Sequence, residues 1–176
     1  FAIDFARTNL RIDSPSLLSS PLLLITTAAW AHRRNGHIEP IDAEAFRRWF
    51  LVANAKGRYS RGSSETLLDQ DLAVLRQGGG PDELMQRLEQ QMGRVDFTPN
   101  DLVARTSTSG IFKTMFLMLK ERGARDWATS LQISPKHANS SDKIEFHHIF
   151  PRALLRSTRS DLEDREINDV SNLAFI

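Results

Sequence analysis

Glycine and proline divide the first two-thirds of this chain into short stretches whose apolar side chains recur at helical spacing. This pattern predicts a run of helices joined by tight turns, because glycine readily adopts the left-handed conformation that ends a helix. Proline is tolerated at the first helical position, where no N–H partner is lost. Helices are expected at about 17–34, 42–56, 64–77, 82–92 and 111–122, with a helical turn at 98–101.

The composition is that of an ordinary folded domain, with 40% hydrophobic and 26% charged residues. No stretch approaches the roughly 20 apolar residues that span a bilayer, so no membrane partner is expected. The chain contains no cysteine, which excludes disulfides and thiolate-bound zinc and suits a cytoplasmic location. A metal ion must therefore take its ligands from His, Asn, Asp or Glu. The absence of an initial methionine leads us to expect a piece of a longer protein.

The character of the sequence changes after Trp127. Residues 130–142 have the composition of a loop, and residues 143–149 have that of a strand. We therefore expect a mainly α fold in two parts, a helical bundle over residues 1–128 and a smaller unit with a short β-hairpin over residues 129–176.

The segment at residues 57–62 contains Arg58 and Arg61, and two interpretations of it stay open. The arginines could contact a phosphate together with backbone N–H groups near a helix start. The segment could equally be a helix-ending turn that docks Tyr59 into the core.

Two adjacent histidines, His147 and His148, stand near the end of the expected strand and are followed by Pro151. Neighbouring side chains on a strand point to opposite faces, so the two imidazoles are expected to have separate tasks. Hydrolysis of a phosphodiester needs an activated water, a cation that neutralises developing charge, and a group that holds the base in place. One histidine can deprotonate the water and the other can bind the cation. Asn172, from the strand expected to pair, is the candidate for holding the base.

The run Phe146-His147-His148-Ile149-Phe150-Pro151, followed by Ser171-Asn172-Leu173, resembles the HNH nucleases, which carry a ββα-metal unit also called the His-Me finger. The resemblance implies that His147 binds a divalent metal, Mg²⁺ or Mn²⁺, and that His148 is the general base. It also implies that Asn172 braces the loop that carries them. His148 and Asn172 are thus the expected catalytic residues, and His147 is the expected metal ligand.

More narrowly, the chain is similar to the C-terminal half of GmrSD-type, modification-dependent restriction proteins of bacteria and archaea. Their helical region commonly carries a segment like residues 57–65 followed by Asp69-Gln70-Asp71-Leu72, ahead of a terminal HNH unit. This resemblance implies a DNA endonuclease of a phage-defence system, with base-modified DNA as its expected target. It also implies an N-terminal nucleotide-hydrolysing domain in the same parent protein, whose Asp-Gly-Gln-Gln-Arg-like motif is not found in this chain.

The end of the chain departs from the pattern of the family. In the family, a helix after the second strand supplies a further metal ligand, usually His or Asn, and this chain stops at Ile176 before such a helix. We therefore expect a truncated nuclease unit and no activity from the chain as given.

Basic residues near the histidines indicate where DNA would lie. Bases outnumber acids between Ala104 and Lys136, and Arg152 and Arg156 share one face of the helix expected after Pro151. Lys136, Arg152 and Arg156 are therefore the candidate DNA contacts. The alternative function is a non-catalytic helical module that binds DNA or a protein subunit and uses the histidines only structurally. An RNase or toxin-like nuclease on the same unit would differ only in its substrate.

Overall fold

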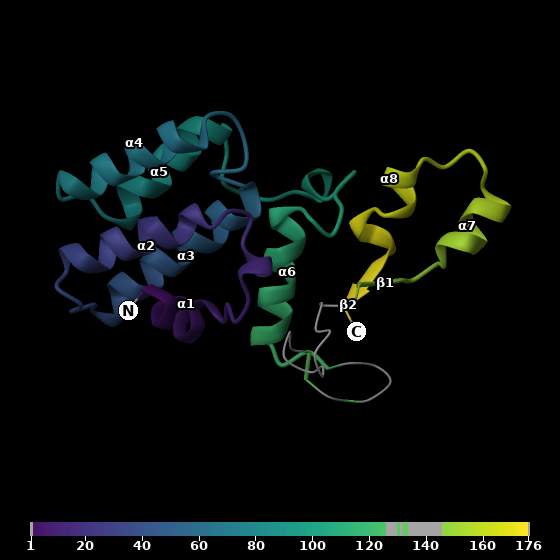
Figure 1. The fold of residues 1–176 in the computed structure, drawn as a ribbon, viewed down its shortest axis with the longest axis horizontal. Helices are drawn as coiled ribbons and strands as arrows, with labels where there is room; N and C mark the ends of the chain where they lie inside the picture. Colours follow the sequence, from purple (N-terminus) through teal and green to yellow (C-terminus); the bar gives the residue numbers. More distant parts are fainter. Residues whose placement is uncertain (1, 126–129, 131, 134–145, 176) are drawn as a thin grey trace. The chain divides into compact units, whose positions relative to one another are not determined.

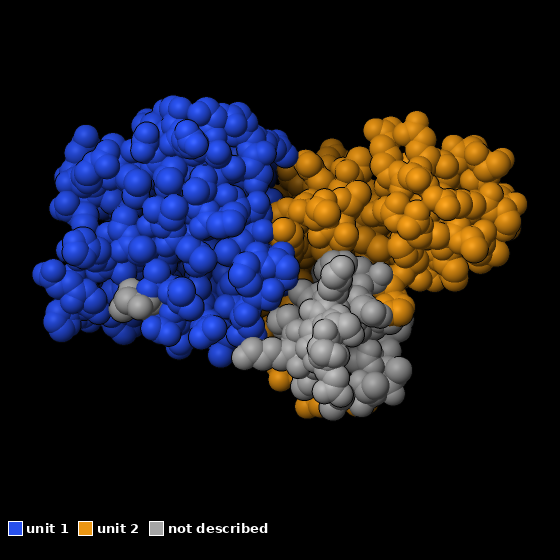
Figure 2. All heavy atoms as spheres, in the orientation of Figure 1, with its two compact units in different colours: residues 1–96 blue, residues 97–176 orange. Residues whose placement is uncertain are grey.

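The computed structural model describes residues 2–125, 130, 132–133 and 146–175 (Figure 1). The fold is mainly α, with eight α-helices and one antiparallel pair of strands in this described part. Contacts group the chain into two compact units, residues 1–96 and residues 97–176 (Figure 2). The sequence predicted a boundary at residues 128–129, between a helical region and a nuclease unit. That boundary divides the chain by function, and it stays a prediction. None of the described helices combines the length and the apolar character needed to cross a lipid bilayer.

Five α-helices build the first unit. They are α1 (Ala2–Leu10), α2 (Leu22–Arg33), α3 (Pro40–Lys56), α4 (Ser64–Arg76) and α5 (Pro81–Met92), and a 3-10 turn, η1 (Pro15–Leu17), lies between the first two. Helix α3 packs against α5, α2 packs against α4, and α1 packs against both α2 and α3. Helices α2 to α5 lie where the sequence predicted helices, whereas α1 was not predicted.

The ends of these helices follow from local chemistry. Gly57 and Gly93 adopt φ angles of 68° and 77° after α3 and α5, in the left-handed region that side chains with a Cβ rarely enter. At the start of α4, the Ser63 hydroxyl accepts a hydrogen bond from the amide of Thr66. It thereby satisfies one of the unpaired amides of the first turn. The sequence predicted that glycine would end these helices and that a helix would begin at about residue 64, and both predictions are confirmed.

A buried asparagine explains the one helix start that the sequence placed too early. Asn54 of α3 accepts a hydrogen bond from the amide of Ser19 at 2.7 Å and donates to the carbonyl oxygen of Leu17 at 3.1 Å. Leu18, between these two residues, has an extended backbone. Helix α2 therefore begins at Leu22 and not near residue 17.

The core of the first unit is aromatic. Trp30 of α2 and Phe46 of α3 stack with their ring centroids 4.0 Å apart and their planes 11° apart. Phe5 of α1 meets both rings edge-on, and Trp49 and Phe50 continue the cluster along α3. All five side chains are buried. Because burying a large apolar side chain contributes about 1.5–3 kcal/mol, this cluster is a main source of the unit's stability.

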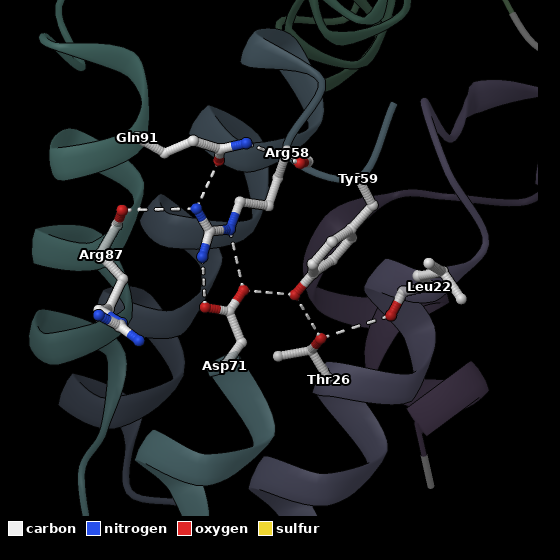
Figure 3. Close-up of polar contacts among 7 residues, drawn as sticks. All are labelled: Leu22, Thr26, Arg58, Tyr59, Asp71, Arg87 and Gln91. Atoms are coloured by element: carbon white, nitrogen blue, oxygen red, sulfur yellow. Dashed lines mark hydrogen bonds and ion pairs between the residues drawn. The ribbon is translucent and has the colours of Figure 1, made fainter. Parts of the chain in front are cut away.

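A polar network lies buried among α2, α4, α5 and the turn after α3 (Figure 3). Arg58 forms a bidentate ion pair with Asp71 of α4, with Nε 3.0 Å from Oδ2 and Nη2 2.6 Å from Oδ1. The two side chains are 1% and 0% exposed. Arg58 Nη1 also donates to the carbonyl oxygen of Arg87 and to the side-chain oxygen of Gln91, both on α5. The guanidinium therefore joins the turn to two helices.

Tyr59 extends this network to α2. Its hydroxyl lies 2.6 Å from Asp71 Oδ2 and 2.8 Å from the hydroxyl of Thr26. Burial raises the pKa of Tyr59 far above its usual value of 10.0, and the negative charge of Asp71 raises it further. Of the two interpretations of residues 57–62, the structure supports the turn that docks Tyr59 into the core. Arg58 is enclosed by its partners and is not available to a phosphate.

The second unit is built around one small sheet. Its elements are η2 (Pro99–Asp101), α6 (Gly110–Glu121), β1 (Phe146–His148), α7 (Arg152–Thr158), α8 (Asp164–Ile167), η3 (Val170–Asn172) and β2 (Leu173–Phe175). Strands β1 and β2 pair antiparallel, and α7 and α8 lie in the connection between them (Figure 1). The predicted hairpin, the helix after Pro151 and the helix that corresponds to α6 are confirmed. Residues 143–145 of the expected strand lie outside the described residues.

Candidate functional site

The two histidines occupy the last two positions of β1. In the antiparallel register, His147 pairs with Ala174 and His148 pairs with Leu173. Successive side chains of a strand project to opposite faces, and the two imidazoles differ accordingly: His147 is exposed and His148 is half-buried. The strand therefore gives the two rings different surroundings, as separate tasks would require.

The turn that follows the histidines is held by Asn172. The backbone amide of Ile149 donates to the carbonyl oxygen of Asn172 at 2.9 Å. The Asn172 carboxamide then bonds Phe150 twice, accepting from its amide at 2.8 Å and donating to its carbonyl oxygen at 3.1 Å. It also donates to the carbonyl oxygen of Ile167 at 2.9 Å. Asn172 is only 7% exposed, so these bonds form in a water-poor environment where they are hard to replace.

The ring of His148 has a side-chain partner of its own. His148 Nε2 lies 2.9 Å from Oδ1 of Asn168, the residue that follows α8. The other end of that carboxamide, Nδ2, donates to the backbone carbonyl oxygen of Asp164 at 2.6 Å. Sequence reasoning assigned the holding of the base to Asn172 and missed Asn168. The only available signal was the presence of a second asparagine four residues before Asn172.

The expected DNA contacts on α7 lie in a mixed-charge surface. Arg156 forms an exposed ion pair with Asp164 at 2.7 Å, and hydrogen bonding to Arg156 lowers the pKa of Asp164. Arg152 is exposed, and its charge acts in the same direction on Asp164. An exposed pair of this kind contributes little to stability, so a phosphate can readily take the place of Asp164 beside Arg156. The third expected contact, Lys136, lies outside the described residues.

The loop between α7 and α8 carries a second exposed pair. Both carboxylate oxygens of Asp161 bond Arg159, at 2.9 Å and 2.8 Å. The hydrogen bond from Arg159 is the main reason why the pKa of Asp161 falls to about 2. Asp161 therefore stays charged at neutral pH and neutralises Arg159.

Apolar side chains are exposed immediately beside the histidines. Ile149, Phe150 and Leu154 stand out from the turn and from α7, and Phe150 is 59% exposed. Because Asn172 fixes the backbone of Phe150, the Phe150 ring projects from a backbone of defined position. The site is therefore a polar pair of imidazoles next to an apolar surface.

The described residues supply only part of a metal site. Nowhere in residues 2–125, 130, 132–133 or 146–175 do three His, Asp or Glu side chains come together in a way that could hold a metal ion. His147 is exposed on β1, and a single imidazole does not fix a divalent cation. Asp142 and Glu145, which precede β1, lie outside the described residues. The described side chains thus fit one ligand position, and further ligands would have to come from other residues.

Comparisons with known proteins give no match: no family model, no curated protein and no solved structure matches this chain. The function of this site is therefore inferred from the arrangement of His147, His148, Asn168 and Asn172.

Proposed function

We propose that this chain carries part of the active site of an HNH-type, metal-dependent DNA endonuclease. The observation that carries the proposal is the arrangement at the end of β1. Two adjacent imidazoles face different surroundings there, and the turn after them is held on both sides by the buried carboxamide of Asn172. This arrangement combines a candidate base, a candidate metal ligand and a rigid support.

In the proposed reaction, His148 accepts a proton from a water molecule. The resulting hydroxide attacks the phosphorus atom, the bond to the leaving oxygen breaks, and that oxygen departs with the electron pair. His148 is suited to this task because its ring is half-buried and bonded through Nε2, so that it is held in one orientation.

A divalent cation, Mg²⁺ or Mn²⁺, would supply charge neutralisation at the phosphate when bound. His147 is the described side chain placed to ligate it, because it is exposed and stands beside the base on the same strand. Arg152 and Arg156 would bind the DNA backbone, and they lie on the helix that follows the turn directly. The resemblance to GmrSD-type proteins adds two parts to this proposal. The enzyme would act on modified phage DNA, and its parent protein would also contain a nucleotide-hydrolysing domain.

Plasmid nicking by the natural full-length protein tests this proposal. Supercoiled DNA, with and without modified bases, is incubated with Mg²⁺ or Mn²⁺, and with a chelator as the control. We expect cleavage only with metal, faster cleavage of the modified DNA, and loss of cleavage in His147→Ala. His37→Ala is the matched control, because His37 is exposed and lies in the first unit. Metal-independent cleavage, or a His147→Ala protein as active as His37→Ala, would refute the proposal.

One observation favours a second candidate function. Among the described residues, no group of three His, Asp or Glu side chains could hold a metal ion, and a non-catalytic module that binds DNA or a subunit would need no such group. In that case the full-length protein would bind its partner without cleaving DNA, and His147→Ala would leave that binding unchanged.

A further inference from the structure

We propose that Asn168 is a positioning residue that keeps His148 protonated on Nε2, so that Nδ1 is the nitrogen that accepts the proton of water. This inference rests on the proposed function and names the atom that performs its first step. It depends on three contacts, which are described in turn.

The first contact fixes which end of the Asn168 carboxamide faces the histidine. Asn168 Nδ2 donates to the carbonyl oxygen of Asp164 at 2.6 Å, and the backbone amide of Asn168 donates to the same oxygen at 3.1 Å. A flipped carboxamide would place Oδ1 against that carbonyl oxygen, where two acceptors repel each other. The carboxamide is therefore held with Oδ1 toward His148.

The second contact fixes the position of the proton on the ring. Oδ1 of a carboxamide can only accept a hydrogen bond, so Nε2 of His148, which lies 2.9 Å away, must donate one. A neutral imidazole with a proton on Nε2 has its lone pair on Nδ1. Among the residues that the structure describes, none forms a hydrogen bond to Nδ1 of His148. Nδ1 is therefore the ring nitrogen that this proposal assigns to the water molecule.

The third contact links this arrangement to the support of the turn. Ile167, which precedes Asn168, is buried, and its carbonyl oxygen accepts a hydrogen bond from Asn172 Nδ2 at 2.9 Å. Asn172 thus holds the end of α8 as well as Phe150. Asn172 fixes the backbone on both sides of the site, and Asn168 fixes the imidazole of His148.

The test combines a spectroscopic measurement with kinetics on the full-length protein. Histidine labelled with ¹⁵N reports which ring nitrogen of His148 carries the proton and how slowly that proton exchanges. We expect a slowly exchanging Nε2–H signal in the wild-type protein and its loss in Asn168→Leu. Asn168→Leu should lower kcat by about 10–100-fold at nearly unchanged KM, as is typical when the partner of a functional histidine is lost.

Asn100→Leu is the matched control, because Asn100 is exposed and lies in the same unit. It should change neither the His148 signal nor kcat, and the thermal unfolding of each variant shows whether it is folded. A cleaving protein with the proton on Nδ1, or with an Asn168→Leu variant as active as Asn100→Leu, would overturn this inference alone. A wild-type protein that does not cleave DNA under any condition would overturn the proposed function, and the inference with it.

Discussion

Asn172 holds the backbone of Phe150 from both sides, with Oδ1 2.8 Å from the amide nitrogen and Nδ2 3.1 Å from the carbonyl oxygen. The side chain of one residue thus replaces the backbone partners that a strand would have supplied had β1 continued. This relationship stops the strand directly after His148 and fixes the direction in which the chain leaves it. It also exposes the Phe150 ring while its backbone is paired.

Replacement of Asn172 by alanine should loosen this turn. The substitution removes three hydrogen bonds and leaves the polar groups of Phe150 and Ile167 without these partners. We expect the free energy of unfolding of the second unit to fall by about 1–3 kcal/mol, and the amide of Phe150 to exchange with solvent faster. Hydrogen exchange measured by NMR checks this result, with Asn100→Ala as the exposed control. Unchanged protection of the Phe150 amide would contradict the described role of Asn172.

Replacement of Asp71 by alanine should destabilise the first unit strongly. It would leave the guanidinium of Arg58 buried without its ion-pair partner, which costs about 3–5 kcal/mol in comparable cases. Urea denaturation measures the loss. The control is Asp69→Ala on the same helix, because Asp69 is exposed and its removal should have little effect. Equal stability of the two variants would show that the network in Figure 3 is not a source of stability.

The ionisation of Tyr59 gives a prediction for alkaline pH. Burial and Asp71 raise the pKa of this phenol in the folded state, whereas in the unfolded chain it should be near 10. The folded protein therefore binds the proton more tightly, and its stability should fall as pH rises above 10. Tyr59 is the only tyrosine in the chain, so the phenolate absorbance band reports on it alone. We expect no phenolate until the protein unfolds; a normal titration of the folded protein would contradict the buried contact with Asp71.

The basic residues of α7 give a prediction for DNA binding. If Arg152 and Arg156 each contact a phosphate, replacing either by alanine should lower the slope of log affinity against log salt by about one. Binding measured by fluorescence anisotropy at several salt concentrations checks this slope. The control is Arg94→Ala, because Arg94 also forms an ion pair, with Asp96, but lies in the first unit. An unchanged slope in both α7 variants would exclude these arginines from the DNA interface.

The helices could be predicted from the sequence because their ends depend on local chemistry. Gly57 and Gly93 end helices through their own backbone conformation, and Ser63 begins one by bonding an amide three residues away. The start of α2 depends instead on Asn54, which is far from Leu17 in the sequence, and so it was placed too early. Helix α1 was missed altogether.

The candidate site shows the same distinction. The strand, the histidine pair and the following turn could be predicted from residues 146–151, which are contiguous. The contact between His148 and Asn168 could not, because it depends on how the chain folds back through α7 and α8. Arg58 shows a related difficulty. Its exposure depends on Asp71, one helix later, and the sequence alone left open whether it faced solvent or the core.

The role of His148 as the base is tested by the rate of plasmid cleavage by His148→Ala in the full-length protein, measured under single-turnover conditions beside His37→Ala. Loss of a general base lowers rates by about 10²–10⁴-fold, so His148→Ala should cleave at least about 100-fold more slowly while His37→Ala cleaves like the wild type. Equal cleavage by the two variants would contradict the assignment of His148 as the base and, with it, the account of this site as a nuclease centre.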